Sequence, residues 1–147
     1  MAVRKRFLFA GVATIFVVGF MLGSTIQEIQ DLEARSAMRV FELRTYTAPE
    51  GKLVNLKARF RDHTMSLFER HGITNIGYWT PQDEPNSSNT LVYIISHDSR
   101  EAAVASWDAF RSDPEWRRVS RESQVDGRIV NNVESLFLDP TDFSPIR

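Results

Sequence analysis

The chain has 147 residues, of which 42% are hydrophobic and 25% are charged, so its size allows one domain with a tail and excludes a two-domain enzyme. Its 18 basic and 19 acidic residues give a net charge of −1, which supplies no positive field for wrapping a duplex and argues against nucleic-acid binding. The absence of cysteine excludes disulfides, thiolate metal sites and a cysteine nucleophile.

The N-terminal segment has the pattern of a membrane anchor. Residues 1–27 contain no acidic residue and include an uncharged run from Phe7 to Ile26. At about 1.5 Å per residue, a helix of this length crosses the roughly 30 Å hydrocarbon layer of a bilayer. Basic residues precede the run and acidic residues follow it, which favours a cytoplasmic N-terminus and a domain on the outer, periplasmic-type side.

We therefore expect an uncleaved signal anchor over residues 1–27, with membrane contact through residues 7–26. Two alternatives stay open: an exported protein with a cleaved signal peptide, and a mitochondrial protein with a presequence. Residues 28–37 contain good helix formers and neither Pro nor Gly, so they are expected to form a helical stalk. The remaining residues, 38–147, are expected to form the folded domain.

The rest of the chain alternates between strand and helix patterns, with Pro and Gly between them. The expected elements are strands over 38–47, 73–80, 91–95 and 129–138, a helix over 53–71, and a second helix that is capped by Ser99 and restarts at Asp113 and Pro114 before ending near Gly127. The order β-α-β-β-α-β is typical of the ferredoxin-like α+β fold, in which both helices cover one face of a four-stranded antiparallel sheet.

The first strand predicts what lies on the two faces of this sheet. Its alternation places Phe41, Leu43 and Thr45 on one face and sends Val40, Glu42, Arg44 and Tyr46 to the face away from the helices. Residues 91–95 are apolar on both faces, whereas a strand with one wet face would alternate. We therefore expect a second sheet, from an identical subunit, to cover the face that the helices leave open.

Three short motifs carry a family resemblance. They are residues 41–46 (Phe-Glu-Leu-Arg-Thr-Tyr), residues 77–79 (Gly-Tyr-Trp) and residues 113–116 (Asp-Pro-Glu-Trp). In this order and spacing, the chain resembles the NIPSNAP family over about residues 38–145. The resemblance implies a homodimeric α/β barrel of ferredoxin-like protomers. It implies no particular reaction.

A polar cluster is expected where the first and last strands meet. Glu42 and Arg44 share one face of the first strand, and Glu134 and Asn132 share one face of the last. The ferredoxin-like order makes these strands neighbours, and arginine can satisfy a buried carboxylate through paired hydrogen bonds. The cluster is interpreted either as a structural ion pair that fixes register or the dimer, or as an anchor for an anionic or polar ligand.

Histidine offers the one candidate for a catalytic or haem-ligating residue. His63 and His71 are eight residues apart and do not share one ridge of a helix, so no metal site is expected there. No cofactor is predicted, but haem ligation by His63 stays open because this residue is in mid-helix beside Phe60 and Leu67. The other interpretation of His63 is a histidine at the boundary of helix and sheet that bonds a backbone carbonyl.

Aromatic residues are concentrated in this small domain and could line a pocket for a flat ligand or simply form core and interface. Neither a nucleophile motif nor a phosphate-binding loop is present. The candidate ligand-binding residues are Glu42, Arg44, Tyr46, His63, Tyr78, Trp79 and Trp116.

These patterns favour a non-enzymatic, membrane-anchored NIPSNAP-type homodimer that binds a small ligand or a protein partner. Two alternatives remain at this point. The first is a monooxygenase-like enzyme of the dimeric α/β barrel type acting on an aromatic or oxidisable substrate. The second is an accessory subunit of a larger membrane complex.

Overall fold

The structure, a computed structural model, describes residues 39–146. The predicted anchor (residues 1–27) and stalk (residues 28–37) lie outside these residues. Between residues 39 and 146, no helix combines the length and the apolar character needed to cross a bilayer.

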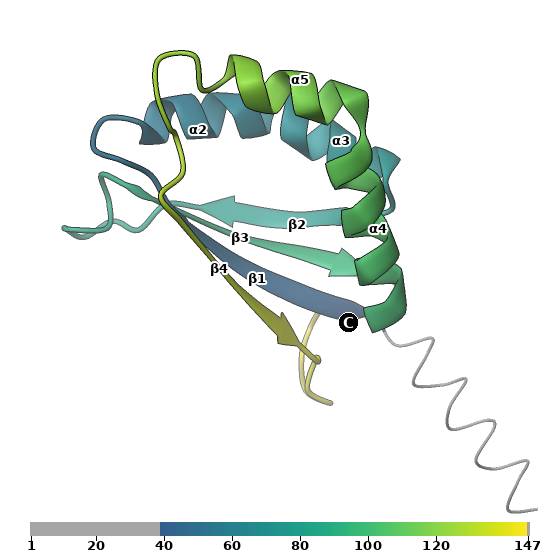
Figure 1. The fold of residues 1–147 in the computed structure, drawn as a ribbon. Coiled ribbons are helices and arrows are strands. Elements are labelled where there is room, and N and C mark those ends of the chain that lie inside the picture. The colour runs from purple at the N-terminus through teal and green to yellow at the C-terminus, as the bar shows by residue number, and fades with distance from the viewer. Residues whose placement is uncertain (1–38, 147) are drawn as a thin grey trace, which may run out of the picture. The chain divides into compact units, whose positions relative to one another are not determined.

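Four antiparallel strands form a single sheet in the order β2-β3-β1-β4, which confirms the predicted sheet and the pairing of the first strand with the last (Figure 1). Their bounds are Val40–Thr47 for β1, Thr74–Trp79 for β2, Thr90–His97 for β3 and Asn132–Leu138 for β4. In the two pairings that β1 makes, Arg44 lies opposite Tyr93 of β3 and opposite Ser135 of β4. This register sets which side chains meet across the sheet.

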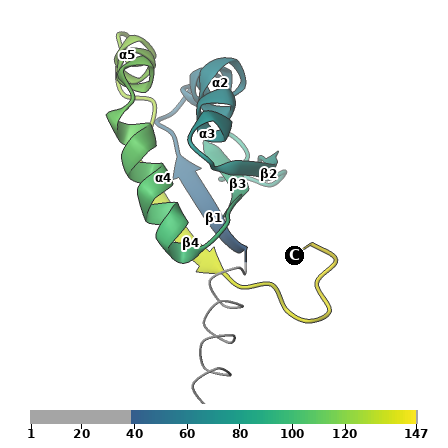
Figure 2. The same ribbon diagram turned by 90° about the vertical axis from the view of Figure 1, so that its right-hand side faces the viewer.

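The helices pack on one face of this sheet, and the C-terminal segment lies on the other (Figure 2). They are α2 (Leu53–Arg59), the π-helical turn η1 (Phe60–Thr64), α3 (Met65–Arg70), α4 (Arg100–Ser112) and α5 (Pro114–Glu122). This confirms the α+β architecture that the element order predicts.

The boundaries of the second helical region depend on two capping side chains. Ser99 Oγ accepts a hydrogen bond of 3.1 Å from the Ala102 amide at the start of α4. Asp113 Oδ1 accepts one of 2.6 Å from the Glu115 amide, and Pro114 occupies the first turn of α5. These caps satisfy amide groups that have no partner within a helix, so the predicted start and restart are both confirmed.

The first helical region differs from the single helix predicted over 53–71, because η1 interrupts it with a wider π turn. Thr64 Oγ1 donates to the Arg59 carbonyl oxygen at 3.2 Å within this turn. An inserted π turn shifts the helical phase, and π turns occur often at functional sites. Phe60 and Thr64 are consequently both buried, while His63 is exposed on the outer surface of the helices.

The core between helices and sheet is built around aromatic rings. Phe68 is 1% exposed, and its ring centre lies 4.9 Å from that of Phe110, 5.4 Å from that of Trp107 and 6.2 Å from that of Tyr93. These partners come from α4 and β3. Phe68 therefore joins α3 to the second helical region and to the sheet.

The predicted faces of β1 are wrong. Glu42 accepts a hydrogen bond from Trp107 of α4, and the Tyr46 ring contacts Phe60 of η1, so the even-numbered residues of β1 face the helices. Period-two alternation identifies which residues share a face, but it does not identify which of the two faces is covered. The side of β1 that faces the helices can be polar because Trp107 of α4 donates a hydrogen bond to Glu42.

The face away from the helices, here called the open face, carries an apolar row among polar residues such as Thr45 and Glu134. Leu43 lies opposite Ile94 on β3 and Leu136 on β4, so these three side chains form a row across the sheet. Leu136 is 57% exposed and Trp79, on the edge strand β2, is 53% exposed. Part of the open face lies under the C-terminal segment, with a cavity of about 340 Å³ between them.

We expect Phe68→Ala to lower the free energy of unfolding by about 3–5 kcal/mol, because it removes a fully buried ring and leaves a cavity. Val104→Ala is the control, since Val104 is 57% exposed on α4 and its truncation should stay within about 0.5 kcal/mol of the parent. Guanidinium unfolding of the full chain in mild detergent, followed by tryptophan fluorescence, measures both. Equal effects of the two substitutions would contradict this account of the core.

Candidate functional site

A buried carboxylate lies at the centre of the polar residues on the helix side of the sheet. Glu42 is 1% exposed and forms an ion pair with Arg44. It also accepts hydrogen bonds from Ser135 Oγ at 2.6 Å, Trp107 Nε1 at 2.7 Å and His97 Nε2 at 3.1 Å. A carboxylate has about four acceptor positions, so these four donors occupy its capacity.

The environment of Glu42 keeps it ionised. Burial alone would raise the pKa of Glu42, but the hydrogen bonds from His97, Ser135 and Trp107 and the charge of Arg44 lower it to about 2. A general base for chemistry near neutral pH needs a pKa closer to 7 and a free acceptor position. Glu42 therefore acts as a structural tie that joins β1, β3, β4 and α4.

Arg44 is held between this carboxylate and aromatic rings. Its guanidinium carbon lies 4.4 Å from the Trp107 ring centre, and its Nη2 is 3.5 Å from the Tyr46 hydroxyl. Burial opposes the charge, but the nearby phenol groups of Tyr93 and Tyr46 and the Glu42 carboxylate outweigh it and raise the pKa of Arg44. The structure thus brings Glu42, Arg44 and Tyr46 together, and the Arg44 charge is paired there although its Nε has no hydrogen-bond partner.

A groove beside the edge strand, here called the β2 groove, brings Tyr78 and Trp79 together. Its volume is about 380 Å³, within the roughly 300–1,000 Å³ of small-molecule sites. Apolar side chains dominate the lining and two cations border it, the full set being Lys57, Phe60, Arg61, Met65, Tyr78, Trp79, Thr80 and Leu91. Of the sequence-predicted candidates, only Tyr78 and Trp79 reach this groove.

Tyr78 and Trp79 are held in the groove by different contacts. The Tyr78 ring stacks on Tyr93 with centres 5.1 Å apart, its hydroxyl donates to Asn75 Oδ1 at 2.5 Å, and burial raises the pKa of Tyr78. The Trp79 ring lies over Gly77, where an added Cβ would approach it to 2.5 Å. Gly77 therefore leaves the space in which Trp79 forms one wall of the groove.

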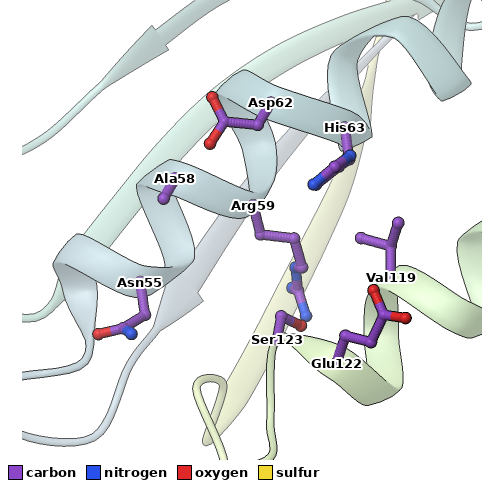
Figure 3. Close-up of a pocket in the computed structure, with 8 residues that line it drawn as sticks. All are labelled: Asn55, Ala58, Arg59, Asp62, His63, Val119, Glu122 and Ser123. Atoms are coloured by element: carbon purple, nitrogen blue, oxygen red, sulfur yellow. The ribbon is translucent and has the colours of Figure 1, made fainter.

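His63 lies in a third place, between η1, α2 and α5 (Figure 3), and Trp116 of α5 contacts Arg59 near it. His63 lines a cavity of about 220 Å³ there, here called the α2–α5 cavity. Trp116 packs on Phe110 at 4.4 Å and lies 5.2 Å from the Arg59 guanidinium carbon. Pockets for drug-sized ligands have volumes of roughly 300–1,000 Å³, and a porphyrin is larger than such ligands. The cavity of about 220 Å³ is therefore too small for the haem interpretation of His63.

Some residues of the polar cluster were not predicted. Glu134 lies opposite Thr45 and not on the Glu42 side, whereas its neighbour Ser135 reaches Glu42. The expected cluster joins Glu42 to the wrong side of the last strand, because the register between the two strands is not given by either strand alone. His97 has a signal in the sequence, since it continues the alternation of the buried residues Tyr93 and Ile95.

Arg59 was not predicted either, although it follows Leu56 by three residues and thus lies on the buried side of its helix. Within residues 39–146, no group of three His, Asp or Glu side chains is placed to hold a metal ion.

We expect Glu42→Gln to lower the free energy of unfolding by about 3 kcal/mol at pH 7, because it leaves the Arg44 charge without its buried partner. The pKa of Glu42 falls from about 4.5 to about 2 on folding, so its contribution is complete above pH 4.5 and is lost as the pH falls towards 2. The difference between parent and variant should therefore shrink between pH 5 and pH 2. Denaturant unfolding across this range measures it, with the exposed Glu50→Gln as control; a constant difference would contradict the assignment.

The comparisons with known proteins agree on the family. A family model described as NIPSNAP matches residues 41–145. No match is found among curated proteins. The solved structures described next are less than 25% identical to this chain, so their similarity shows the fold alone.

Two solved structures of NIPSNAP proteins are similar to this chain. One, an uncharacterized NIPSNAP-like domain protein from Burkholderia xenovorans, is 18% identical with a TM-score of 0.64, and the match covers 74% of this chain and 90% of that one. The other, a NIPSNAP family protein from Agrobacterium tumefaciens, is 22% identical with a TM-score of 0.65, over 74% and 99% of the two chains.

A more distant structure is SnoaB, a cofactor-independent oxygenase from Streptomyces nogalater, with 13% identity and a TM-score of 0.50 over 74% of this chain and 99% of that one. The family model spans most of the described residues and includes all three sequence motifs. This chain belongs to the NIPSNAP family.

Proposed function

We propose that this chain is a non-enzymatic binding protein that takes a flat, largely apolar anion in the β2 groove. The composition of the groove carries the proposal, because Phe60, Tyr78 and Trp79 offer apolar walls while Lys57 and Arg61 supply positive charge. Sites for small molecules combine such apolar walls with a few polar groups that orient the ligand.

The cations are placed to act together. Lys57 and Arg61 are four residues apart across the junction of α2 and η1, which puts them on the same side of the helix. Neither forms an ion pair within the described residues, so both charges are available to a ligand. An acidic group held there would direct the flat part of the molecule between Tyr78 and Trp79.

The proposal includes a homodimer formed through the open face. The row of Leu43, Ile94 and Leu136 supports it, because Leu136 is 57% exposed beside the half-buried Leu43 and Ile94, and apolar residues that reach the surface together can mark an interaction site. A second copy is the occupant that the family architecture favours. Trp79 borders both the open face and the β2 groove, so the partner subunit would approach the ligand site.

The proposal also places the protein at a membrane. The apolar run over residues 7–26 supports a single-pass anchor with the domain on the outer side. Export with a cleaved signal peptide, a mitochondrial location and membership of a larger membrane complex are the competing proposals. Sequencing the N-terminus of the protein from membrane fractions separates the anchor from a cleaved leader.

For the β2 groove, we expect the full chain in mild detergent to bind 2-naphthoate and to bind the neutral 2-naphthamide at least tenfold more weakly. Trp79→Ala should weaken naphthoate binding by about tenfold, because an aromatic wall contributes about 1–1.5 kcal/mol. Phe143→Ala is the matched control, since Phe143 is 82% exposed and lies outside the groove.

Calorimetric titration gives the affinities. Equal binding of acid and amide, or an unchanged Trp79→Ala variant, would overturn the groove assignment. Mass spectrometry of the recovered naphthoate tests the competing enzyme: an added oxygen would show that the groove performs oxidation.

For the dimer, native mass spectrometry of the full chain released from mild detergent should show two copies. Leu136→Glu should give monomers, because it places a charge in the apolar row of the open face. Val125→Glu introduces the same charge at another exposed apolar residue, 79% exposed and outside the sheet, and should leave the dimer intact. A mass that corresponds to one copy of the parent protein would refute the dimer.

A further inference from the structure

The α2–α5 cavity has no role in the function proposed above. It lies on the other side of α2 from the β2 groove, because Arg59 is two residues from both Lys57 and Arg61 and so projects from the opposite side of the helix. Its volume is about 220 Å³, and its lining consists of Asn55, Ala58, Arg59, Asp62, His63, Val119, Glu122 and Ser123. Figure 3 shows the Arg59 side chain crossing from α2 towards α5 and ending beside Ser123.

Arg59 is a buried cation without an anion. It is 7% exposed, and its Nε has no hydrogen-bond partner. Within the described residues no acidic group lies at ion-pair distance from it. Its guanidinium carbon makes a cation-π contact with the Trp116 ring, whose centre is 5.2 Å away. The half-buried Arg44, by contrast, has the Glu42 carboxylate as its partner. Buried charges are rare unless they are paired, so the missing anion at Arg59 requires an explanation.

The protein holds Arg59 in place at a cost to its charged form. Burial lowers the pKa of the Arg59 guanidinium, and the neighbouring phenol groups of Tyr46 and Tyr93 offset only part of this effect. An anion from outside would reverse the imbalance. Guanidinium is suited to this, because Nε–H and Nη–H form a planar fork that matches the two oxygens of a carboxylate.

The cavity rim selects the charge of the anion. Asp62 and Glu122 line it, but Asp62 points away from Arg59 and the exposed Glu122 is paired with Arg118 at 2.6 Å (Figure 3). The Asp62 and Glu122 carboxylates near the opening repel a doubly charged anion more strongly than a singly charged one. The apolar walls, Ala58 and Val119, leave room for a short aliphatic group and not for a second charge.

The geometry points to a second binding site, in the α2–α5 cavity, for a small monocarboxylate with a short aliphatic substituent. Its carboxylate pairs with Arg59 through the free Nε–H and a neighbouring Nη–H. Its substituent packs against Ala58 and Val119, and His63 closes the mouth as a further polar partner. Because the site faces away from the β2 groove, the proposal for this cavity does not depend on the function proposed for that groove.

The test uses the full chain in mild detergent at constant ionic strength, with propionate as the probe and chloride as the background anion. Propionate should bind saturably and raise the unfolding temperature, whereas neutral propionamide and inorganic phosphate should not. Arg59→Met should bind propionate at least tenfold more weakly, and Arg59→Lys should fall between, because lysine keeps the charge and lacks the fork. Arg121→Met, at an exposed arginine of α5 outside the cavity, should keep the parent affinity.

A second variant keeps the test decisive if Arg59→Met does not fold. Ala58→Leu fills the cavity beside an intact Arg59 and should abolish propionate binding. Propionamide binding as tightly as propionate would overturn the proposal, as would parent affinity in both Arg59→Met and Ala58→Leu. Phosphate that binds as tightly as propionate and depends on Arg59 would overturn the assignment of the ligand as a monocarboxylate.

Discussion

The Glu42 carboxylate is the point on which the arrangement of sheet and helices depends. A charge with 1% exposure is tolerable only because β1, β3, β4 and α4 each supply a donor to it. A shift of β4 by one residue would turn Ser135 to the other face, and a displaced α4 would withdraw Trp107. The polar cluster therefore selects one register and one helix position, where apolar packing alone would tolerate several.

Much of the fold could be predicted because its signals are local. The caps at Ser99 and Asp113 and the order of the strands follow from neighbouring residues, and the strand order then implies that β1 and β4 pair. The faces of β1 could not be predicted in the same way. Glu42 and Arg44 resemble solvent-facing residues until Trp107, 65 positions later, is known to meet them.

The candidate site divided into three places for a related reason. The seven predicted residues were chosen by chemical type, but their positions depend on helical phase and on strand parity. The π turn η1 has no clear sequence signature, and it moves His63 to the outer surface while Phe60 stays buried. Arg59 was overlooked because an arginine in mid-helix usually reaches solvent, and only its spacing from Leu56 signals burial.

Arg44 and Arg59 show how one domain can separate structural charge from charge kept for a ligand. The charge of Arg44 is neutralised by Glu42, whereas Arg59 has no acidic partner among the described residues; the Nε of each lacks a hydrogen-bond partner. Tyr46 and Tyr93 lie within electrostatic reach of both guanidinium groups. An anion at Arg59 would change the field at these phenol groups and so at Arg44. Ligand binding in the α2–α5 cavity would then change the electrostatic environment of the Glu42 cluster, which holds the sheet and helices together.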